Sequence, residues 1–214
     1  MIKSRTTQLI FQTTYLAFGF IGILASLGLF VAEFQNNFYV YFTNISNYIC
    51  IAIMFFELIE TIKKDKDSYV KLNPLLKFMG ILMILLTFFV FNILLADDRT
   101  IQQNLSVSSL LLHVALPIMF VTDWLLFYER KQIKWTYPLL AIIVPFVYVV
   151  FIYLRAFLLN GKGELIYPYF FFDINELGIN GVLQWILILL TAFVVVGFMI
   201  YGLDRILKKN NYKK

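Results

Sequence analysis

The stretch Tyr41-Phe42-Thr43-Asn44-Ile45-Ser46-Asn47-Tyr48-Ile49-Cys50 opens a segment that is otherwise apolar enough to cross a membrane. It nevertheless places two asparagines, a serine and a threonine within five residues. Positions i, i+3, i+4 and i+7 share one face of an α-helix. The stretch therefore predicts a polar stripe, made up of Thr43, Ser46, Asn47, Cys50, Met54 and Glu57. Because polar groups in lipid are costly unless they face partners, the stripe predicts a bundle of membrane helices packed around it.

The composition agrees with a membrane protein. The chain has 214 residues, of which 61% are hydrophobic and 14% charged, and its mean hydropathy is +0.80. A soluble domain has about 45–50% apolar and about 25% charged residues. The single cysteine, Cys50, excludes an intrachain disulfide. His113 is the single histidine, so no Cys/His cluster is available for zinc or iron. We expect neither a metal nor a cofactor.

Six apolar runs are each long enough to span a bilayer. The predicted spans are 9–32, 39–62, 75–96, 106–128, 136–158 and 181–206. The sequence contains no internal repeat, low-complexity tract or second domain. We therefore predict an all-α integral membrane protein, with one domain over residues 1–214 that forms a bundle of six transmembrane helices.

The distribution of lysine and arginine predicts the orientation of the bundle. With six spans both termini share a side, and fifteen of the 18 lysines and arginines fall on that side. The other side has Arg99, Arg155 and Lys162. The positive-inside rule then places both termini in the cytoplasm, and it explains the net charge of +5 without a nucleic-acid partner. A bias toward lysine, asparagine, isoleucine and phenylalanine is typical of an AT-rich bacterial genome, so we expect a bacterial inner (cytoplasmic) membrane and lipid partners.

This orientation gives the polar residues a depth. At ~1.5 Å per residue, Thr43 lies ~5 Å and His113 ~10 Å below the outer boundary of the membrane. Further polar residues are expected near them at the outer ends of the helices: Asn44, Asn47, Asn92, Arg155 and Asp173. The aromatic segment 167–173 is expected above this group. Glu57 and Asp123 fall in the opposite half of the span.

His113 is the leading candidate for a functional residue, because an ionisable residue within a span is a functional candidate by default. Pro117 lacks the N–H group that would bond to the His113 carbonyl, so the helix should bend there and leave that carbonyl free, which makes a small polar cavity plausible. Asp123 lies ~15 Å further along the axis and cannot orient the imidazole. It is expected near the inner headgroups or paired with a neighbouring helix. Asn47, Asn92 and Asp173 remain alternatives for holding the imidazole.

Each of the other candidates also has a structural interpretation. The Thr43 hydroxyl could bond to the carbonyl one turn earlier. Asn44 and Asn47 could fasten helices together. Arg155 could be a snorkelling anchor instead of a counter-charge for an anionic group. The aromatic segment 167–173 could be an interfacial belt instead of a lid over the site.

Several motifs resemble, in order, those of the androgen-induced and androgen-dependent transmembrane proteins and their bacterial relatives. The resemblance covers most of the chain and is most specific in the Thr-Asn-Ile-Ser-Asn and His-Val-Ala-Leu-Pro elements. The matching elements are Tyr41–Asn47, His113–Pro117, Asp123–Phe127, Trp135–Pro138, Tyr167-Pro168 and Asp173.

Members of that family with known activity are multispanning threonine hydrolases that cleave fatty-acid esters of hydroxy fatty acids. The resemblance implies that Thr43 is the nucleophile and His113 its base, in an intramembrane hydrolase of lipid esters. Such chemistry is coherent, since a hydroxyl needs a base to accept its proton and donors to stabilise the oxyanion. Asn44, Asn47 or backbone N–H groups could be those donors. Two alternatives remain: a small-molecule carrier, and a non-enzymatic assembly protein in which these residues only fasten helices.

Overall fold

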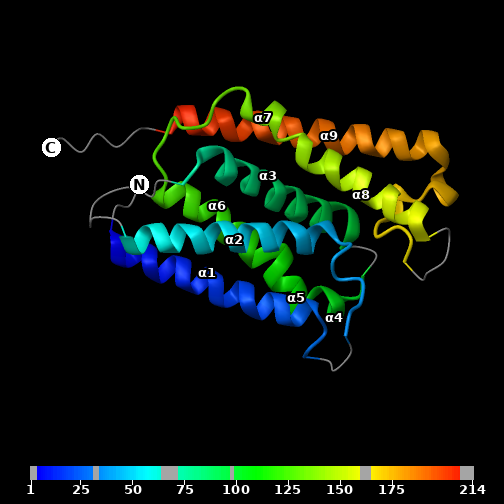
Figure 1. The fold of residues 1–214 in the computed structure, drawn as a ribbon, viewed down its shortest axis with the longest axis horizontal. Coiled ribbons are helices and arrows are strands. Elements are labelled where there is room, and N and C mark those ends of the chain that lie inside the picture. Colours follow the sequence, from blue (N-terminus) through cyan, green and yellow to red (C-terminus); the bar gives the residue numbers. More distant parts are fainter. Residues whose placement is uncertain (1–3, 31–33, 64–71, 97–98, 160–164, 208–214) are drawn as a thin grey trace. The chain divides into compact units, whose positions relative to one another are not determined.

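The computed structural model describes residues 4–30, 34–63, 72–96, 99–159 and 165–207, and within them it contains helices and turns but no strand (Figure 1). The first two helices are α1 (Arg5–Ser26) and α2 (Phe42–Lys63), and the third is α3 (Pro74–Val90), which continues into the π-helical turn η1 (Phe91–Leu95). The short helix α4 (Ile101–Asn104) precedes the fourth span. That span consists of α5 (Val107–Leu110), the π-helical turn η2 (Leu111–Ala115) and α6 (Leu116–Phe127). The remainder consists of α7 (Tyr137–Leu140), α8 (Ile143–Leu159), the 3₁₀ turn η3 (Phe170–Phe172) and α9 (Ile174–Ile206).

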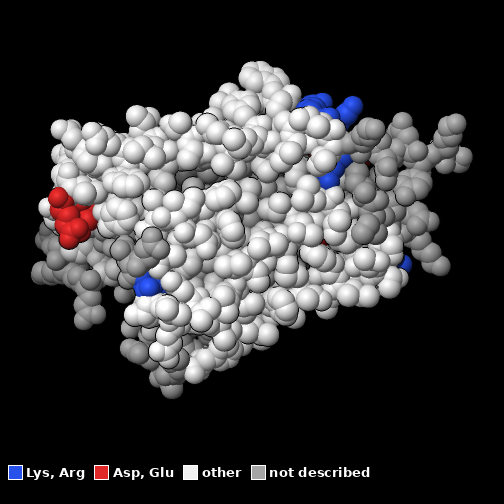
Figure 2. All heavy atoms as spheres, turned by 180° about the vertical axis from the view of Figure 1, so that it is seen from behind, with Lys and Arg blue, Asp and Glu red and all other residues white. Residues whose placement is uncertain are grey.

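Six helices in the described ranges are long and apolar enough to cross a membrane. They are Arg5–Ser26, Phe42–Lys63, Pro74–Leu95, Val107–Phe127, Tyr137–Leu159 and Ile174–Ile206. Large apolar side chains on them are exposed, such as Ile10 (64%), Phe157 (79%) and Leu187 (67%). Figure 2 shows broad uncharged surfaces between the few described charged side chains. Surfaces of this kind require lipid and not water, which indicates a multi-pass integral membrane protein.

The two largest differences between the helix boundaries and the sequence prediction both occur at glycines. The first helix ends at Ser26 and not at residue 32, because Gly28 has φ of 79°, a left-handed conformation typical of helix ends. In α9, Gly178 has φ of 65° and ψ of 171°, which separates a first turn from the long helix that follows. That long helix therefore starts close to the predicted residue 181.

The chain divides into two compact units, 1–134 with 203–214, and 135–202. In the first unit α1, α2, α3 and α6 pack together, and α1 lies along α2 (Figure 1). Asn73 caps the start of α3, where its side chain accepts from the Leu75 N–H, and Pro74 follows it as the sequence predicts. At the start of α1, Arg5 donates to the carbonyls of Thr61 and Ile62.

The predicted polar stripe of α2 faces the interior of this unit, as expected. Its six residues are all buried, with Thr43 9% exposed and the other five fully enclosed. Close helix contact is helped by Gly80 on α3, where an added Cβ would lie 3.0 Å from atoms of Ile53 and Phe120. The Cys50 thiol lies 3.4 Å from the Gly80 carbonyl oxygen, as expected for a small packing residue.

The second unit has an aromatic core of its own. Phe171 and Phe172 of η3 are buried, and they pack against Trp185 of α9 and against Tyr148 and Tyr153 of α8. The Tyr153 hydroxyl donates to the Phe172 carbonyl over 3.0 Å. The 167–173 segment thus contributes buried packing within its own unit.

Candidate functional site

Thr43 lies in the first turn of α2. That turn is fixed by the Tyr41 carbonyl, which accepts from the N–H groups of Asn44 and Ile45. The Asn44 side chain donates to the Phe38 carbonyl over 2.8 Å, so it holds the preceding turn against the helix. The backbone around Thr43 is therefore held from both sides.

The Thr43 hydroxyl makes no hydrogen bond to any described residue, unlike the hydroxyls of the other two buried threonines. Thr61 donates to the Glu57 carbonyl one turn earlier over 2.9 Å, and the Thr87 and Ser46 hydroxyls lie 2.7 Å apart. Thr43 contributes only its carbonyl, which accepts from the side chains of Ser46 and Asn47. The hydrogen bond from the Thr43 hydroxyl to the carbonyl one turn earlier, which a structural role would provide, is therefore not formed among the described residues.

Asn47 connects the two helices that carry the leading candidates. Its fully buried amide donates to the Thr43 carbonyl over 2.8 Å and to the Leu112 carbonyl over 3.0 Å. Leu112 directly precedes His113 in the chain. A single side chain therefore positions both backbone segments, and it shows that the second and fourth spans are in contact.

His113 lies in the middle of the π-helical turn η2 and is half-buried. Its Nδ1 atom is 3.2 Å from the Ser109 carbonyl oxygen. A carbonyl only accepts, so Nδ1 must carry the proton, and Nε2 of the neutral imidazole is then the acceptor. The ring stacks on Phe91 of η1, with centroids 3.6 Å apart and planes at 15°.

Where the sequence predicts a bend, the structure has the π-helical turn η2. Pro117 follows η2 and has no N–H to donate to the His113 carbonyl. The chain instead makes a wider bond from the Leu116 N–H to the Leu111 carbonyl. The stacking partner Phe91 begins a second π turn, in which the Ala96 N–H donates to Phe91. Single π turns are frequent at functional sites.

Among the described residues, no hydrogen bond joins Thr43 to His113 directly. The structure brings their helices together through Asn47, and it holds the imidazole through Ser109 and Phe91. Neither of those two residues was predicted for that role. For Phe91, the available signal was an aromatic residue near the end of the third predicted span. For Ser109, the signal was its position four residues before His113, on the same helical face.

The three other predicted site residues have different roles. Asn92 is exposed, and its amide donates back to the Phe88 carbonyl of its own helix over 2.7 Å. In the second unit, Arg155 donates to the carbonyls of Leu165 and Ile166, which holds the chain before the aromatic segment. Asp173 accepts from the N–H groups of Asn175 and Glu176 and so caps α9. These contacts do not join the three residues to the Thr43 and His113 neighbourhood.

A second polar group lies toward the other end of α2, and the sequence indicated it only in part. Lys77 Nζ is 2.9 Å from Glu57 Oε2 and 2.7 Å from Asp123 Oδ2, and Tyr128 donates to Glu57 Oε1. We refer to Glu57, Lys77, Asp123 and Tyr128 as the Lys77 cluster. Asp123 thus pairs with a neighbouring helix, one of its two expected settings. Lys77 is one of the fifteen lysines and arginines assigned from the sequence to the side of the termini. Its position inside the predicted span 75–96 was a signal that it is buried.

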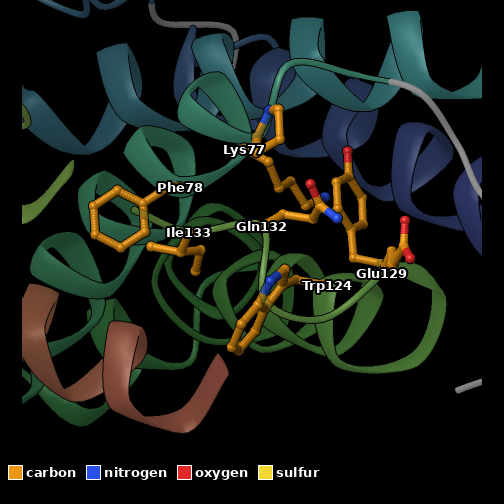
Figure 3. A pocket seen from close by; sticks show the side chains of 8 residues that line it. Lys77, Phe78, Trp124, Glu129, Gln132 and Ile133 are labelled. Atoms are coloured by element: carbon orange, nitrogen blue, oxygen red, sulfur yellow. The ribbon is translucent and has the colours of Figure 1, made fainter. Parts of the chain in front are cut away.

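A small pocket opens beside the Lys77 cluster. It is lined by Pro74, Lys77, Phe78, Trp124, Tyr128, Glu129, Gln132 and Ile133. Figure 3 shows Phe78 and Ile133 on one side and Glu129 on the other, with Lys77 reaching toward Gln132. The loop around it is fastened by Asp204, which accepts from the Ile133 N–H over 3.1 Å, and by Arg130, which lies over the Trp124 ring. Burial lowers the pKa of Arg130, and the nearby Asp204 partly offsets that effect.

No metal site is formed by the side chains that the structure describes, since no three His, Cys, Asp or Glu residues among them are grouped closely enough to hold an ion. The fold and site together define a helical multi-pass membrane protein with two buried polar groups in its first unit. No protein-family model, curated protein or solved structure matches the chain.

Proposed function

We propose that the protein is an intramembrane hydrolase of lipid esters, such as fatty-acid esters of hydroxy fatty acids, with Thr43 as the nucleophile and His113 as the general base. One observation carries the proposal: of the three buried threonines described, only Thr43 leaves its hydroxyl without a hydrogen bond. Thr43 also retains 9% of its surface exposed. The neutral imidazole of His113, with Nε2 as its acceptor, supplies the base.

The reaction follows from these roles. The Thr43 oxygen attacks the ester carbonyl while its proton passes to His113 Nε2, and the imidazolium then gives that proton to the departing alkoxide. In a second step a water molecule, deprotonated by His113, attacks the acyl-threonine, and the imidazolium returns the proton to the departing Thr43 oxygen. Thr43 and His113 make no direct hydrogen bond in the described structure, and catalytic hydrogen bonds often tighten only when the substrate is bound.

The oxyanion donors are expected from the backbone. The amide hydrogens of Asn44 and Asn47 already bond to the carbonyls of Phe38, Thr43 and Leu112. The Thr43 N–H lies in the first turn of α2, where helical N–H groups lack intrahelical partners and the helix dipole favours negative charge. That N–H belongs to the same residue as the proposed nucleophile.

The assembly alternative is weaker for the two catalytic candidates than for their neighbours. Asn47 and Ser46 do fasten helices, through Leu112 and Thr87. Among the described contacts, neither the Thr43 hydroxyl nor the His113 ring makes a hydrogen bond to another helix. This difference favours a chemical role for Thr43 and His113.

A small-molecule carrier is the second candidate, and the Lys77 cluster is the observation that favours it. The cluster supplies buried polar groups in the half of the span where the sequence offered chiefly Glu57 and Asp123. A carrier forms no acyl-threonine and hydrolyses no ester, so the activity test below separates the two candidates.

Hydrolysis of a model lipid ester by the purified protein tests the proposal. We expect Thr43→Ala and His113→Ala each to lower the rate by at least about a hundredfold. The double variant should be no slower than either, because the two residues act as one unit. Thr43→Ser should retain activity. Thr14→Ala is the matched control, since the exposed Thr14 hydroxyl bonds back to the Ile10 carbonyl. A parent protein without hydrolysis, or additive losses, would contradict the proposal.

The location of the protein forms part of the proposal. We infer a bacterial cytoplasmic membrane with both termini in the cytoplasm, supported by the lysines and arginines counted on the side of the termini, even without the buried Lys77. Thr43 would then be near the outer leaflet, where a lipid ester could enter sideways from the membrane.

A further inference from the structure

The three charged side chains of the Lys77 cluster are almost completely buried, and the small pocket lies beside them. The side chains of Glu57, Lys77 and Asp123 are at most 1% exposed. Each comes from a different helix, α2, α3 or α6, and the Lys77 ammonium also lies 3.9 Å from the centroid of the Phe120 ring. The cluster does not belong to the site of Thr43, which is at the other end of α2.

The charges of the cluster do not balance. Two carboxylates face one ammonium, and no other described cation makes an ion pair with either carboxylate. An excess negative charge buried in a membrane protein is costly, because the low-dielectric surroundings do not solvate it. One additional proton on the carboxyl pair would make the cluster neutral.

One carboxyl oxygen of the pair can carry this proton. Both oxygens of Glu57 accept hydrogen bonds, from Lys77 and Tyr128. Asp123 Oδ2 accepts from Lys77, whereas the fully buried Oδ1 has no partner among the described residues. Burial and the two carboxylates raise the pKa of Tyr128, so its phenol keeps the proton that it donates to Glu57.

The Tyr15 hydroxyl is a second buried polar group without a hydrogen bond among the described residues. The Tyr15 hydroxyl of α1 is fully enclosed, makes no hydrogen bond within the described part of the chain, and lies within electrostatic range of both carboxylates. Its ring packs 5.9 Å from that of Phe120. Among the described residues, Lys77 and Tyr128 contact the carboxyl pair, and Tyr15 and Cys50 interact with it electrostatically.

We propose that the Lys77 cluster is a buried proton-binding site, in which Glu57 and Asp123 together hold one proton at neutral pH and exchange it with water through the adjacent pocket. Lys77 and Tyr128 belong to both the cluster and the pocket lining, and Glu129 and Gln132 line the same pocket (Figure 3). The sequence predicts that this side of the membrane is the cytoplasm. Loss of the proton changes the cluster from neutral to a charge of −1, which makes the packing of α2, α3 and α6 sensitive to the pH on that side.

Infrared spectroscopy of the full-length protein in detergent tests the site. A neutral carboxyl has a carbonyl stretch distinct from that of a carboxylate, and the stretch shifts in D₂O when the proton exchanges. We expect such a band at neutral pH in the parent protein. Asp123→Asn and Glu57→Gln should each remove it, because the remaining carboxylate then balances Lys77. Glu60→Gln, which removes an exposed carboxyl on α2, should leave it unchanged. A parent spectrum without the band, or a band undiminished in both cluster variants, would overturn the proposal.

The pH dependence of unfolding provides a second readout. The unfolded carboxyls, with pKa values of about 4, lose the proton that the folded cluster keeps, so the folded state binds more protons at neutral pH. Stability should therefore fall as pH rises, by up to about tenfold in the folding constant per pH unit. Asp123→Asn should remove this slope, and Lys77→Met should steepen it because two carboxyls then need protons. A parent whose stability rises with pH between about 7 and 8, above the unfolded histidine pKa of about 6.5, would contradict the account.

Discussion

Two threonines of α2 use their hydroxyls in opposite ways. Thr61 bonds back to the Glu57 carbonyl, whereas Thr43, in the first turn, has no helical carbonyl one turn earlier to bond. The sequence alone could not separate these cases, because the general preference of a membrane threonine is to bond back. Only the position of the helix start, fixed by Tyr41 and Asn44, decides it.

At the residue scale, Asn47 should matter for both stability and activity. Asn47→Ala removes its hydrogen bonds to the carbonyls of Thr43 and Leu112, so we expect a loss of roughly 1–2 kcal/mol in the free energy of unfolding. Ester hydrolysis should fall as well, because the backbones beside both catalytic residues lose their common support. Denaturation of the purified protein and an activity assay measure the two effects.

Asn92→Ala is the matched control for this substitution. Its exposed amide bonds within its own helix, so stability should stay within about 0.5 kcal/mol of the parent. If Asn92→Ala were as damaging as Asn47→Ala, the assigned role of Asn47 would be wrong.

The sequence predicted the elements better than the contacts that each would make. The polar spacing on α2 correctly indicated a single buried face, because helical periodicity alone determines which residues share a face. Lys77 could not be paired in advance with Glu57 and Asp123, since that requires the packing of three helices. Asn92 fell at a suitable depth but on an exposed face, and depth alone does not give direction.

At the element scale, Pro117 accounts for the π turn that holds His113. Pro117→Ala restores an N–H group, which allows the regular bond to the His113 carbonyl and a rotation of the imidazole. We expect the thermal midpoint to hold or rise. Hydrolysis should fall on the order of tenfold to a hundredfold, because small displacements of a catalytic group are costly. Unchanged activity in a folded Pro117→Ala protein would show that the π turn does not shape the site.

At the scale of the whole molecule, six apolar runs sufficed to predict six helices long enough to span a membrane, because hydropathy over about 20 residues determines insertion. The irregular elements, such as the turns at Gly28 and Gly178, required the backbone conformation. The division into two compact units likewise depends on contacts that no residue pattern gives.

Thiol labelling in intact cells tests the predicted orientation. In a Cys50→Ser background, single cysteines at the exposed positions Asn36 and Gln102 should react with an impermeant reagent, and cysteines at Lys63 and Lys134 should not. All four positions should react after the membrane is permeabilised. Protection of the first pair with labelling of the second would reverse the orientation and place Thr43 near the cytoplasmic side.

The most direct measurement of the central claim is to locate the nucleophile that reacts with a fluorophosphonate probe. The parent protein, treated with a fluorophosphonate probe and digested, should carry the adduct on Thr43 when peptides are sequenced by mass spectrometry. Thr14→Ala should be labelled normally, His113→Ala much more slowly, and Thr43→Ala not at all. An adduct on another residue, or robust labelling of a folded Thr43→Ala protein, would show that Thr43 is not the nucleophile.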